Sequence, residues 1–437
     1  MIWFFIFFVI LLILNSLPLF AGLGALAVLL TGFFSGKESL VNVFIDPLGR
    51  LTQNDMLLPV VFFTIMGYIV ARSGAPERFV KLFQYLMQGL FNKAAFSIGV
   101  MAILVSAFFT PLTGASGVTI IALGGILMPA LARVAYPENL RLGIIASSGS
   151  LGLLFFPSIP VILYGIVSNN KVSISDLFRA GILPGALLVL LPSLYVFWAT
   201  RKFKAAQVTV SFAEVKKVLP RISLELLIFP LMYFLFMSGK IAVSEIGLIA
   251  LLYFLVLEVV FFKEISRGQL SGLLLDSASV AGGILIIIFF ATSFTSFMID
   301  YEIPRKLFDW IGQYIHSKWT FLVVLNIFLL LVGSLMDIFS AIIVVAPLVI
   351  PLAELYNVNM IHLGILFLTN LEIGYITPPV GMNLFLAAFR FKVPMTKVYR
   401  AILPFLFILL LAQLVITYVP QLSLGLLNSG QVRGEQP

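Results

Sequence analysis

The sequence has no cysteine, only two histidines and few charged residues. Of its 437 residues, 11% are charged and 61% are apolar, whereas about 25% of the residues in a soluble domain are charged. The lack of cysteine excludes disulfides, thiolate nucleophiles and cysteine-bound metals. His316 and His362 lie at segment ends without a partner at metal-ligand spacing, and we interpret both as polar residues at the membrane interface. The composition therefore predicts an integral membrane protein.

Apolar runs of roughly 17–25 residues recur along nearly the whole chain, and each can cross a hydrocarbon core about 30 Å thick as a helix. The period-2 alternation of an outer-membrane barrel is absent. No P-loop, metal motif or catalytic triad occurs, which argues against ATP-driven transport and against a membrane-embedded enzyme. We therefore predict an all-α polytopic membrane protein that is not an enzyme, with spans near residues 2–14, 18–34, 55–71, 180–200, 222–238, 243–262, 275–299 and 400–420.

Between the spans lie three kinds of segment that do not fit a simple crossing, and each kind occurs twice. Amphipathic segments are expected to lie in the membrane interface. Apolar arms joined by a small polar tip indicate a re-entrant hairpin, and glycine or proline halfway along an apolar helix interrupts its hydrogen-bond ladder. The pairs are arm helices at 76–91 and 304–315, hairpins at 95–134 and 319–355, and broken helices at 139–168 and 361–391.

The order of these segments indicates an internal duplication. Pro157 recurs as Pro378 and Arg179 recurs as Arg400, each 221 positions later. Shared apolar composition does not explain ordered proline and arginine anchors. We therefore predict a first repeat at 1–200 with scaffold spans in 2–71, a basic linker at 201–221, a second repeat at 222–420 with spans in 222–299, and a tail at 421–437.

Each repeat crosses the membrane five times if the hairpins return to their own side. Because five is odd, the second repeat is inverted relative to the first. With the basic linker in the cytoplasm, the cytoplasmic loops hold 18 of the 27 Lys and Arg residues, as the positive-inside rule requires. This topology predicts that both termini lie outside the cytoplasm.

Inverted repeats with broken helices are typical of secondary transporters, whose ion and substrate sites lie near the membrane midplane at the interruptions. Freed carbonyls can bind a cation there, and half-helix N-termini can bind an anion. The first tip, at 110–117, and the first interruption, at 147–152, combine glycines with hydroxyl side chains. Close helix packing through small residues is the alternative explanation for the tip.

The second tip and the second interruption each contain one acid. Asp337 and Glu372 are the only acids that we identify deep inside apolar segments. A charge at the midplane costs at least ~2.5–3.5 kcal/mol, which favours a functional role. The alternatives are a structural hydrogen bond for Asp337 and capping of the broken helix for Glu372.

Several stretches resemble the large membrane (permease) subunit of the tripartite ATP-independent periplasmic (TRAP) transporters. They are TGASG, SSGSLG, PSIP, LYGIV, GSLMD, NLEIG and TPPVGMNLF, and the resemblance extends from about Leu57 to Val419. It implies two inverted repeats arranged as scaffold and transport domains, and an elevator-type, sodium-driven uptake of a carboxylate across the bacterial inner membrane. The sequence departs from the usual pattern at Thr113 to Ser116, where relatives often have Ser-Gly-Ser-Ser, and at Ile338, where proline more often follows the Asp.

The resemblance also implies ligands, with each tip paired with its own interruption. Sodium is the implied coupling ion, and neither an organic cofactor nor a transition metal is expected. The implied sodium-binding residues are Thr113, Gly114, Ser116, Gly117, Ser148, Gly149, Gly152, Ser334, Asp337, Ser340, Asn370, Gly374 and Thr377. The implied substrate-binding residues are Ser147, Ser150, Pro157, Ser158, Glu372, Pro378, Pro379 and Asn383.

The partners that the resemblance implies are a small four-helix membrane subunit, a periplasmic solute-binding protein and membrane lipids, with no nucleic acid. We expect the small subunit to be a separate polypeptide. The carried solute would be a C4-dicarboxylate, sialic acid or a related organic acid. The alternative function is a proton-coupled, stand-alone organic-anion carrier or antiporter of the inverted-repeat class.

Overall fold

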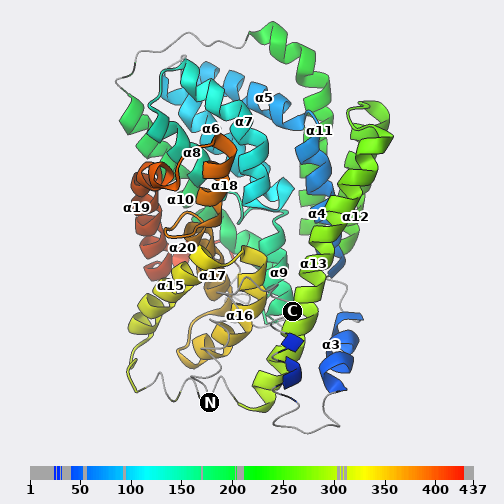
Figure 1. The fold of residues 1–437 in the computed structure, drawn as a ribbon, viewed down its shortest axis with the longest axis vertical. Coiled ribbons are helices and arrows are strands. Elements are labelled where there is room, and N and C mark those ends of the chain that lie inside the picture. Colours follow the sequence, from blue (N-terminus) through cyan, green and yellow to red (C-terminus); the bar gives the residue numbers. More distant parts are fainter. Residues whose placement is uncertain are drawn as a thin grey trace.

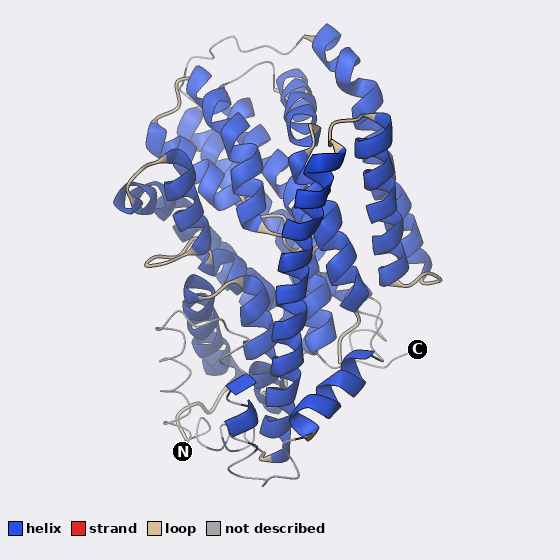
Figure 2. Cartoon of the chain, turned by 45° about the vertical axis from the view of Figure 1, so that its right-hand side comes forward, coloured by secondary structure: helices blue, strands red, loops and turns tan. Residues whose placement is uncertain are grey.

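The helices of the computed structural model follow the apolar runs of the sequence (Figure 1). The structure describes residues 41–52, 57–91, 95–168, 171–201, 203, 211–302 and 313–427, with a few positions between 24 and 31 and residues 306 and 309. Within these residues Figure 2 shows helices and loops but no strand. By length and apolar composition, nine of the described helices can cross a membrane, or ten if one bent pair counts as a span. The predicted all-α polytopic fold is confirmed.

Most of the predicted spans coincide with single helices, several of which are longer than expected. The predicted spans at 2–14 and, for the most part, 18–34 lie outside the described residues. A short helix that we did not predict, α3 (Asn42–Thr52), precedes the third span. The remaining spans are α4 (Leu57–Arg72), α10 (Ile174–Thr200), α11 (Phe212–Ser238), α12 (Val243–Leu255) with its π-helical continuation η2 (Val256–Phe261), α13 (Arg267–Asp300) and α19 (Met395–Tyr418).

The predicted basic linker at 201–221 is shorter than expected, because α11 begins at Phe212. Ser211 and Glu214 form a capping box, in which the Ser211 hydroxyl accepts a hydrogen bond from the Glu214 N–H at 3.3 Å and the Glu214 carboxylate accepts one from the Ser211 N–H at 3.3 Å. This reciprocal pair satisfies two N–H groups at the start of the helix. The tail also contains one helical turn, α20 (Gln421–Leu424).

The first arm helix, α5 (Ala75–Leu90), leaves α4 at an angle of 72°. The bend lies at Ser73 and Gly74, and Pro76 occupies the first turn of α5, where proline is tolerated because its missing N–H would have no helical partner. The second predicted arm, at 304–315, falls mostly on residues that the structure does not describe.

Both predicted hairpins consist of two helices that meet at the expected tip. The first contains α6 (Ala95–Thr113) and α7 (Ser116–Arg133), and the second contains α15 (Lys318–Leu335) and α16 (Ile338–Leu355). Gly114 has a φ of +66° at the first tip, a conformation that costs little only for glycine.

Both predicted broken helices are interrupted as expected. The first runs from α8 (Glu138–Ser148) to α9 (Ile159–Val167), and the second runs from α17 (Met360–Gly374) to α18 (Met382–Phe391). Each interruption contains a cis X-Pro bond, at Pro157 and at Pro379.

The two repeats pack against each other crosswise. The second arm of each hairpin contacts the second half-helix of the other repeat, since α7 packs on α18 and α16 packs on α9. Likewise α8 packs on α19 and α17 packs on α10. Figure 1 places α6 and α7 in the upper half and α15 and α16 in the lower half, with the broken helices between them. This arrangement brings both tips and both interruptions to the middle of the molecule.

Candidate functional site

The first hairpin tip packs directly on the first interruption. The Thr110 hydroxyl lies 3.0 Å from the Gly149 carbonyl oxygen, to which it can donate, and 2.7 Å from the Ser106 carbonyl oxygen. A Cβ atom on Gly152 would lie only 2.1 Å from the Ala107 carbonyl oxygen. Glycine at position 152 therefore allows the backbone of the interruption to touch the backbone of α6.

The second tip repeats this arrangement. A Cβ atom on Gly374 would lie 2.7 Å from Gly333 Cα and 3.1 Å from the Leu330 carbonyl oxygen. The Gly381 N–H donates a hydrogen bond to the Ser334 carbonyl oxygen at 2.9 Å. Gly374 follows Gly152 by 222 positions, so the duplication preserves a backbone contact and not only a sequence pattern.

Hydrogen bonds join the two tip and interruption pairs to each other. The Ser116 hydroxyl, on the first tip, donates to the side-chain oxygen Oδ1 of Asn383 in the second repeat at 2.7 Å. The Ser150 hydroxyl of the first interruption is 3.5 Å from the Glu372 carbonyl oxygen. The sequence assigned Ser116 to an ion and Asn383 to the substrate, and the structure places the two side chains in contact. An ion site and a solute site built on them would share one hydrogen bond.

Four helix N-termini and four helix C-termini face this central region. Helices α7, α9, α16 and α18 begin at it, and α6, α8, α15 and α17 end at it. The N-terminal N–H groups carry partial positive charge and favour an anion, while the C-terminal carbonyls favour a cation. The backbone alone therefore brings partial charges of both signs to this region.

The predicted hydroxyl groups mostly donate to carbonyls of their own segment. Such a hydroxyl keeps its lone pairs, which can face a cation. The distances from hydroxyl to carbonyl oxygen are 3.1 Å for Thr113 to Thr110, 3.2 Å for Ser147 to Ile144, 3.5 Å for Ser148 to Ile145, 2.8 Å for Ser334 to Leu331 and 2.9 Å for Thr377 to Ile373.

Asp337 is the N-cap of α16. Its carboxylate accepts hydrogen bonds from the Ser340 N–H at 3.0 Å and from the Ser340 hydroxyl. Beside it the Ile338 N–H donates to the hydroxyl of Tyr375, a residue of the second interruption that we did not assign to the site. The capping contact is the structural hydrogen bond that is the alternative role of Asp337. The same contact also holds the carboxylate in place at the second tip.

Glu372 and Ser158 are buried without hydrogen-bond partners for their side chains. Glu372 is 1% exposed, and neither carboxyl oxygen has a partner; the same is true of the Ser158 hydroxyl, which is fully buried at the start of α9. Burying such groups without a partner is unfavourable, so both positions are candidates for contact with a ligand. Pro157, Pro378 and Pro379 shape the same two interruptions.

One implied ligand takes part in a second polar cluster through its amide nitrogen. The Asn370 side-chain NH2 donates to Asn326 Oδ1 at 2.7 Å, and the same oxygen accepts from Gln413 at 2.9 Å and from Thr417 at 3.2 Å. Asn370 therefore belongs to a buried amide cluster between α15, α17 and α19. Its own side-chain oxygen, the atom that would bind sodium, is buried without a hydrogen-bond partner, so the role as a sodium ligand stays a prediction.

The comparisons with known proteins identify the family of the chain. The profile of the family described as "Tripartite ATP-independent periplasmic transporter, DctM component" matches residues 4–422. The chain belongs to this family. The C4-dicarboxylate TRAP transporter large permease protein DctM of Pseudomonas aeruginosa is 30% identical over 410 residues, which cover 93% of this chain and 92% of that protein. The resemblance stated from the motifs is confirmed.

One further relative and one solved structure are also similar to this chain. The isethionate TRAP transporter permease protein DctMQ of Oleidesulfovibrio alaskensis is 25% identical over 374 residues, which cover 84% of this chain and 57% of that protein. The Alcanivorax borkumensis YdaH transporter, a solved structure, has a TM-score of 0.64 and 16% identity over 95% of this chain and 99% of that one. This last similarity supports the fold alone.

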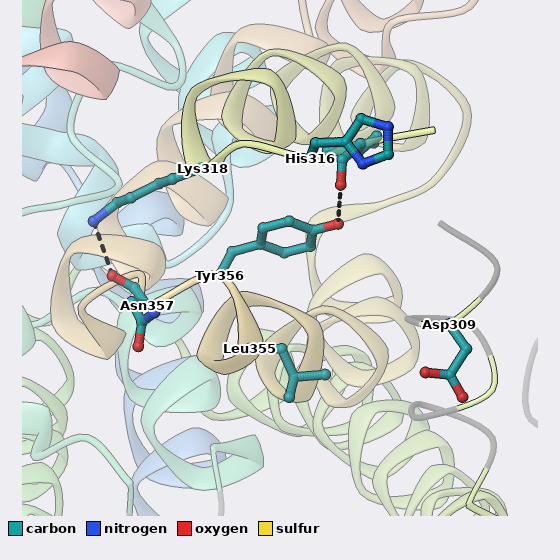
Figure 3. Close-up of a pocket in the computed structure, with 7 residues that line it drawn as sticks. Asp309, His316, Lys318, Leu355, Tyr356 and Asn357 are labelled. Atoms are coloured by element: carbon teal, nitrogen blue, oxygen red, sulfur yellow. Dashed lines mark hydrogen bonds between the residues drawn. The ribbon is translucent and has the colours of Figure 1, made fainter. Parts of the chain in front are cut away.

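One open pocket of this DctM component lies away from the tips (Figure 3). It has a volume of about 570 Å³ at the ends of α15 and α16 that are remote from Asp337. The Tyr356 hydroxyl donates to the Ile315 carbonyl oxygen at 2.9 Å, and the Lys318 ammonium donates to the Asn357 carbonyl oxygen at 2.8 Å. None of the residues implied by the family resemblance lines it; the lining residues are Asp309, Ile315, His316, Lys318, Leu355, Tyr356 and Asn357.

One sequence interpretation of polar residues in the DctM component is wrong. Asp337 and Glu372 are not the only acids deep inside apolar segments, because Glu225 on α11 and Glu258 in η2 are fully buried. His362, in the first turn of α17, is buried within the protein, where it is 2% exposed and its Nδ1 lies 3.0 Å from the Ser423 hydroxyl. The sequence does not display these contacts between distant segments.

Proposed function

We propose that this DctM component imports a small carboxylate across the bacterial inner membrane, driven by a sodium gradient and by an elevator movement of its central domain. The observation that carries the proposal is the pairing of each hairpin tip with its own interruption, with the two pairs joined across the repeats by Ser116 and Asn383. Irregular backbone in the middle of a membrane protein is expected to serve a binding site.

Sodium suits the donor set of the two pairs. The first pair offers hydroxyl oxygens of Thr113 and Ser116 and carbonyls at the end of α8, and the second adds the carboxylate of Asp337. Hard cations take oxygen ligands of these kinds. We assign one sodium ion to each pair. The alternative function, a proton-coupled carrier or antiporter, would use Asp337 to carry protons instead.

The substrate would lie between the two pairs. Half-helices α9 and α18 begin there, and their free N–H groups favour an anionic group. Ser158 has a buried hydroxyl with no partner, and Asn383 provides a side-chain amide. The named relatives handle C4-dicarboxylates and isethionate, which are small anions. A C4-dicarboxylate, sialic acid or a related organic acid fits this chemistry.

The elevator would move the hairpins, the broken helices and the packed helices α10 and α19 against a scaffold of α4, α11, α12 and α13. Small and aromatic residues form the interface between these two bodies. A Cβ atom on Gly67 of α4 would lie 2.6 Å from the Leu112 carbonyl oxygen at the first tip. The ring of Phe156 lies 6.4 Å from that of Phe63 on α4 and 4.7 Å from that of Phe236 on α11.

The partners that we propose are a separate four-helix small subunit and a periplasmic solute-binding protein, with both chain termini in the periplasm. The matched region covers 92% of the large permease and 57% of the DctMQ protein. Membrane lipids would surround the scaffold helices, which expose many apolar side chains.

The experiment that tests the proposal measures uptake of C4-dicarboxylates and sialic acid into proteoliposomes that contain both membrane subunits and the loaded binding protein. We expect uptake to depend steeply on external sodium at fixed pH and to be negligible without the binding protein. Equal uptake in potassium buffer with a proton gradient would refute sodium coupling and favour the alternative.

Replacing Asp337 by asparagine should raise the sodium concentration needed for half-maximal uptake. Asparagine keeps an oxygen and remains a good N-cap for α16, but it removes the charge that we assign to ion binding. Loss of one charged contact is worth ~1.5–3 kcal/mol, or about ten- to 150-fold in apparent sodium affinity. Uptake should therefore fail at ordinary sodium and recover in part at high sodium.

A matched control separates this effect from loss of a helix cap. Asn359 caps α17 by accepting hydrogen bonds from the Ile361 and His362 N–H groups at 3.0 and 3.2 Å. Asn359→Ala should lower the melting temperature, because loss of an N-cap costs about 0.5–2 kcal/mol, and leave the sodium dependence unchanged. An unchanged sodium dependence in Asp337→Asn would leave Asp337 with a structural role only.

A further inference from the structure

Five charged side chains gather where the first arm helix meets the scaffold. Arg78 belongs to the first turn of α5, Arg221 and Glu225 to α11, Glu258 to η2, and Glu264 to the loop that follows η2. Figure 1 shows α5 beside α11 in the upper part of the molecule. We call these five residues the arm cluster. None of them belongs to a hairpin tip or to an interruption.

Arg78 is the centre of the arm cluster. Its Nε donates to Glu225 Oε1 at 2.9 Å, its Nη2 donates to the same oxygen, and its Nη1 donates to Glu264 Oε1. Arg221 donates to Glu264 as well, at 3.0 Å. The ring of Phe262 lies 5.4 Å from the Arg78 guanidinium carbon and 5.2 Å from that of Arg221. The two arginines therefore already bind two carboxylates and contact one aromatic ring.

Glu258 is the residue of the arm cluster whose carboxyl group receives no hydrogen bond. It is fully buried, and neither of its carboxyl oxygens has a hydrogen-bond partner. Its Oε1 lies 3.6 Å from Arg78 Nη2, the nitrogen that already donates to Glu225. The carboxyl groups of Glu225 and Glu258 therefore converge on one nitrogen, and the second oxygen of Glu225, Oε2, also has no partner.

The charges of the arm cluster do not balance if every carboxyl is ionised. Two arginines face three glutamates, which leaves one buried negative charge. Burial alone would raise the pKa of Glu264, but the hydrogen bonds from Arg78 and from the Gly74 N–H, with the charges of Arg78 and Arg221, hold that pKa below its ordinary value. Glu264 is therefore ionised, Glu225 holds two Arg78 donors, and the surplus charge falls on Glu258.

A proton on Glu258 accounts for both the surplus negative charge and the carboxyl oxygens that lack a donor. It removes the surplus charge, and it turns Glu258 into a donor for the unpartnered Oε2 of Glu225. Two adjacent carboxyl groups commonly share one proton for this reason. No group of three metal-ligating side chains in the described part of the chain is arranged to hold a metal ion in place of that proton.

We propose that Glu258 is a proton-binding site that completes the attachment of the first arm helix to the scaffold. The other titratable or charged groups nearby are engaged elsewhere. Tyr253 on α12 donates its hydroxyl to the Leu224 carbonyl oxygen at 2.6 Å, and Arg72 on α4 lies 3.5 Å from Asp276 on α13. Whether Glu258 holds a proton is therefore determined by the charges of Arg78, Arg221, Glu225 and Glu264.

The arm cluster fixes where α5 begins. The Gly74 N–H, at the bend between α4 and α5, donates to Glu264 Oε2 at 2.7 Å, and a Cβ atom on Gly74 would lie 2.7 Å from Arg78 Nη1. Loss of the proton from Glu258 places a second full negative charge beside Glu225 and weakens this attachment. The arm is therefore held more firmly when the site is protonated.

Infrared spectroscopy of the lipid-reconstituted protein at neutral pH tests the proposal directly, because a protonated carboxyl and a carboxylate absorb at different frequencies. We expect Glu258→Gln to lose the acid C=O band of one carboxyl group. Glu225→Gln should lose the same band, since it removes one negative charge and lets Glu258 ionise beside Arg78. Glu264→Gln is the matched control, and it should lose carboxylate absorption while keeping the acid band.

The pH dependence of thermal stability provides an independent measurement. The folded protein holds a proton that an exposed glutamate, with a pKa of about 4.3, has lost at neutral pH. Stability should therefore fall as pH rises from the range in which an exposed glutamate ionises to the pH at which folded Glu258 loses its proton, by up to tenfold in the unfolding equilibrium per pH unit for one proton. Above that pH this part of the slope should disappear. Glu258→Gln should remove that part of the slope. Acid C=O absorption that is undiminished in both Glu258→Gln and Glu225→Gln, or a slope that Glu258→Gln leaves unchanged, would overturn the proposal.

Discussion

Replacing Gly152 by alanine should abolish uptake and lower the melting temperature of the protein. The added Cβ atom would lie 2.1 Å from the Ala107 carbonyl oxygen and 2.8 Å from Pro111 Cδ. The obstructing carbonyl belongs to the backbone of α6, which cannot rotate away as a flexible side chain could. Overpacking of this kind costs about 1–3 kcal/mol or more, and here it separates the first tip from the interruption that completes the proposed ion site.

The chain offers a control for this substitution. Gly272 on α13 has no atom within 4 Å of the position that a Cβ would take, so Gly272→Ala should leave uptake unchanged and raise stability slightly, because alanine favours a helix by ~1 kcal/mol relative to glycine. Wild-type uptake and melting temperature in Gly152→Ala would mean that the tip and the interruption do not touch as described. Both variants can be compared by a sodium titration and a thermal unfolding curve.

The sequence was sufficient to predict the parts of the fold that depend on local chemistry. Glycine and proline clustered with small polar residues disfavour a continuous helix, so the tip at Gly114 and the break at Pro157 could be located by inspection. A single proline is not sufficient, because Pro184 lies inside the continuous helix α10. The duplication added the pairing of each tip with its interruption, and Gly152 and Gly374 occupy equivalent contacts. The crosswise packing of α7 on α18 and of α16 on α9 is consistent with the inverted arrangement, but it could be recognised only in the structure.

The errors concern side chains whose partners are distant in sequence. The hydrogen bond from the Asn370 amide nitrogen to Asn326, 44 residues away, was not predicted. Asn326 is a lone polar residue in the apolar helix α15, a signal that could have been used. Glu225 and Glu258 lie inside predicted spans and were overlooked because their counter-charge, Arg78, comes from the arm helix.

The boundaries of the helices also required more than hydropathy. The start of α11 at Phe212 depends on a capping box at Ser211, within a stretch whose basic charge predicts a loop. Charge indicates the side of the membrane on which a segment lies, but it does not exclude helix. The span could therefore be predicted, whereas its first ten residues could not.

The central claim is that the hairpins and broken helices move as one body past the scaffold. Phe156 in the first interruption and Phe63 on α4 lie on opposite sides of the proposed sliding interface, with ring centroids 6.4 Å apart. The chain has no cysteine, so Phe63→Cys with Phe156→Cys introduces a unique pair that a short methanethiosulfonate crosslinker can join. Phe156→Cys with Phe178→Cys is the control, because Phe178 is on α10, inside the proposed moving body, and its ring lies 5.2 Å from that of Phe156.

Sodium-driven uptake by these two crosslinked proteins, measured before and after reduction of the linker, is the most direct test. The elevator account predicts that the Phe63 and Phe156 link reduces uptake to the level of liposomes without protein, and that reduction restores it. It also predicts that the Phe156 and Phe178 link leaves uptake close to that of the uncrosslinked pair. Full uptake with the Phe63 and Phe156 link in place would contradict movement of the central domain past α4.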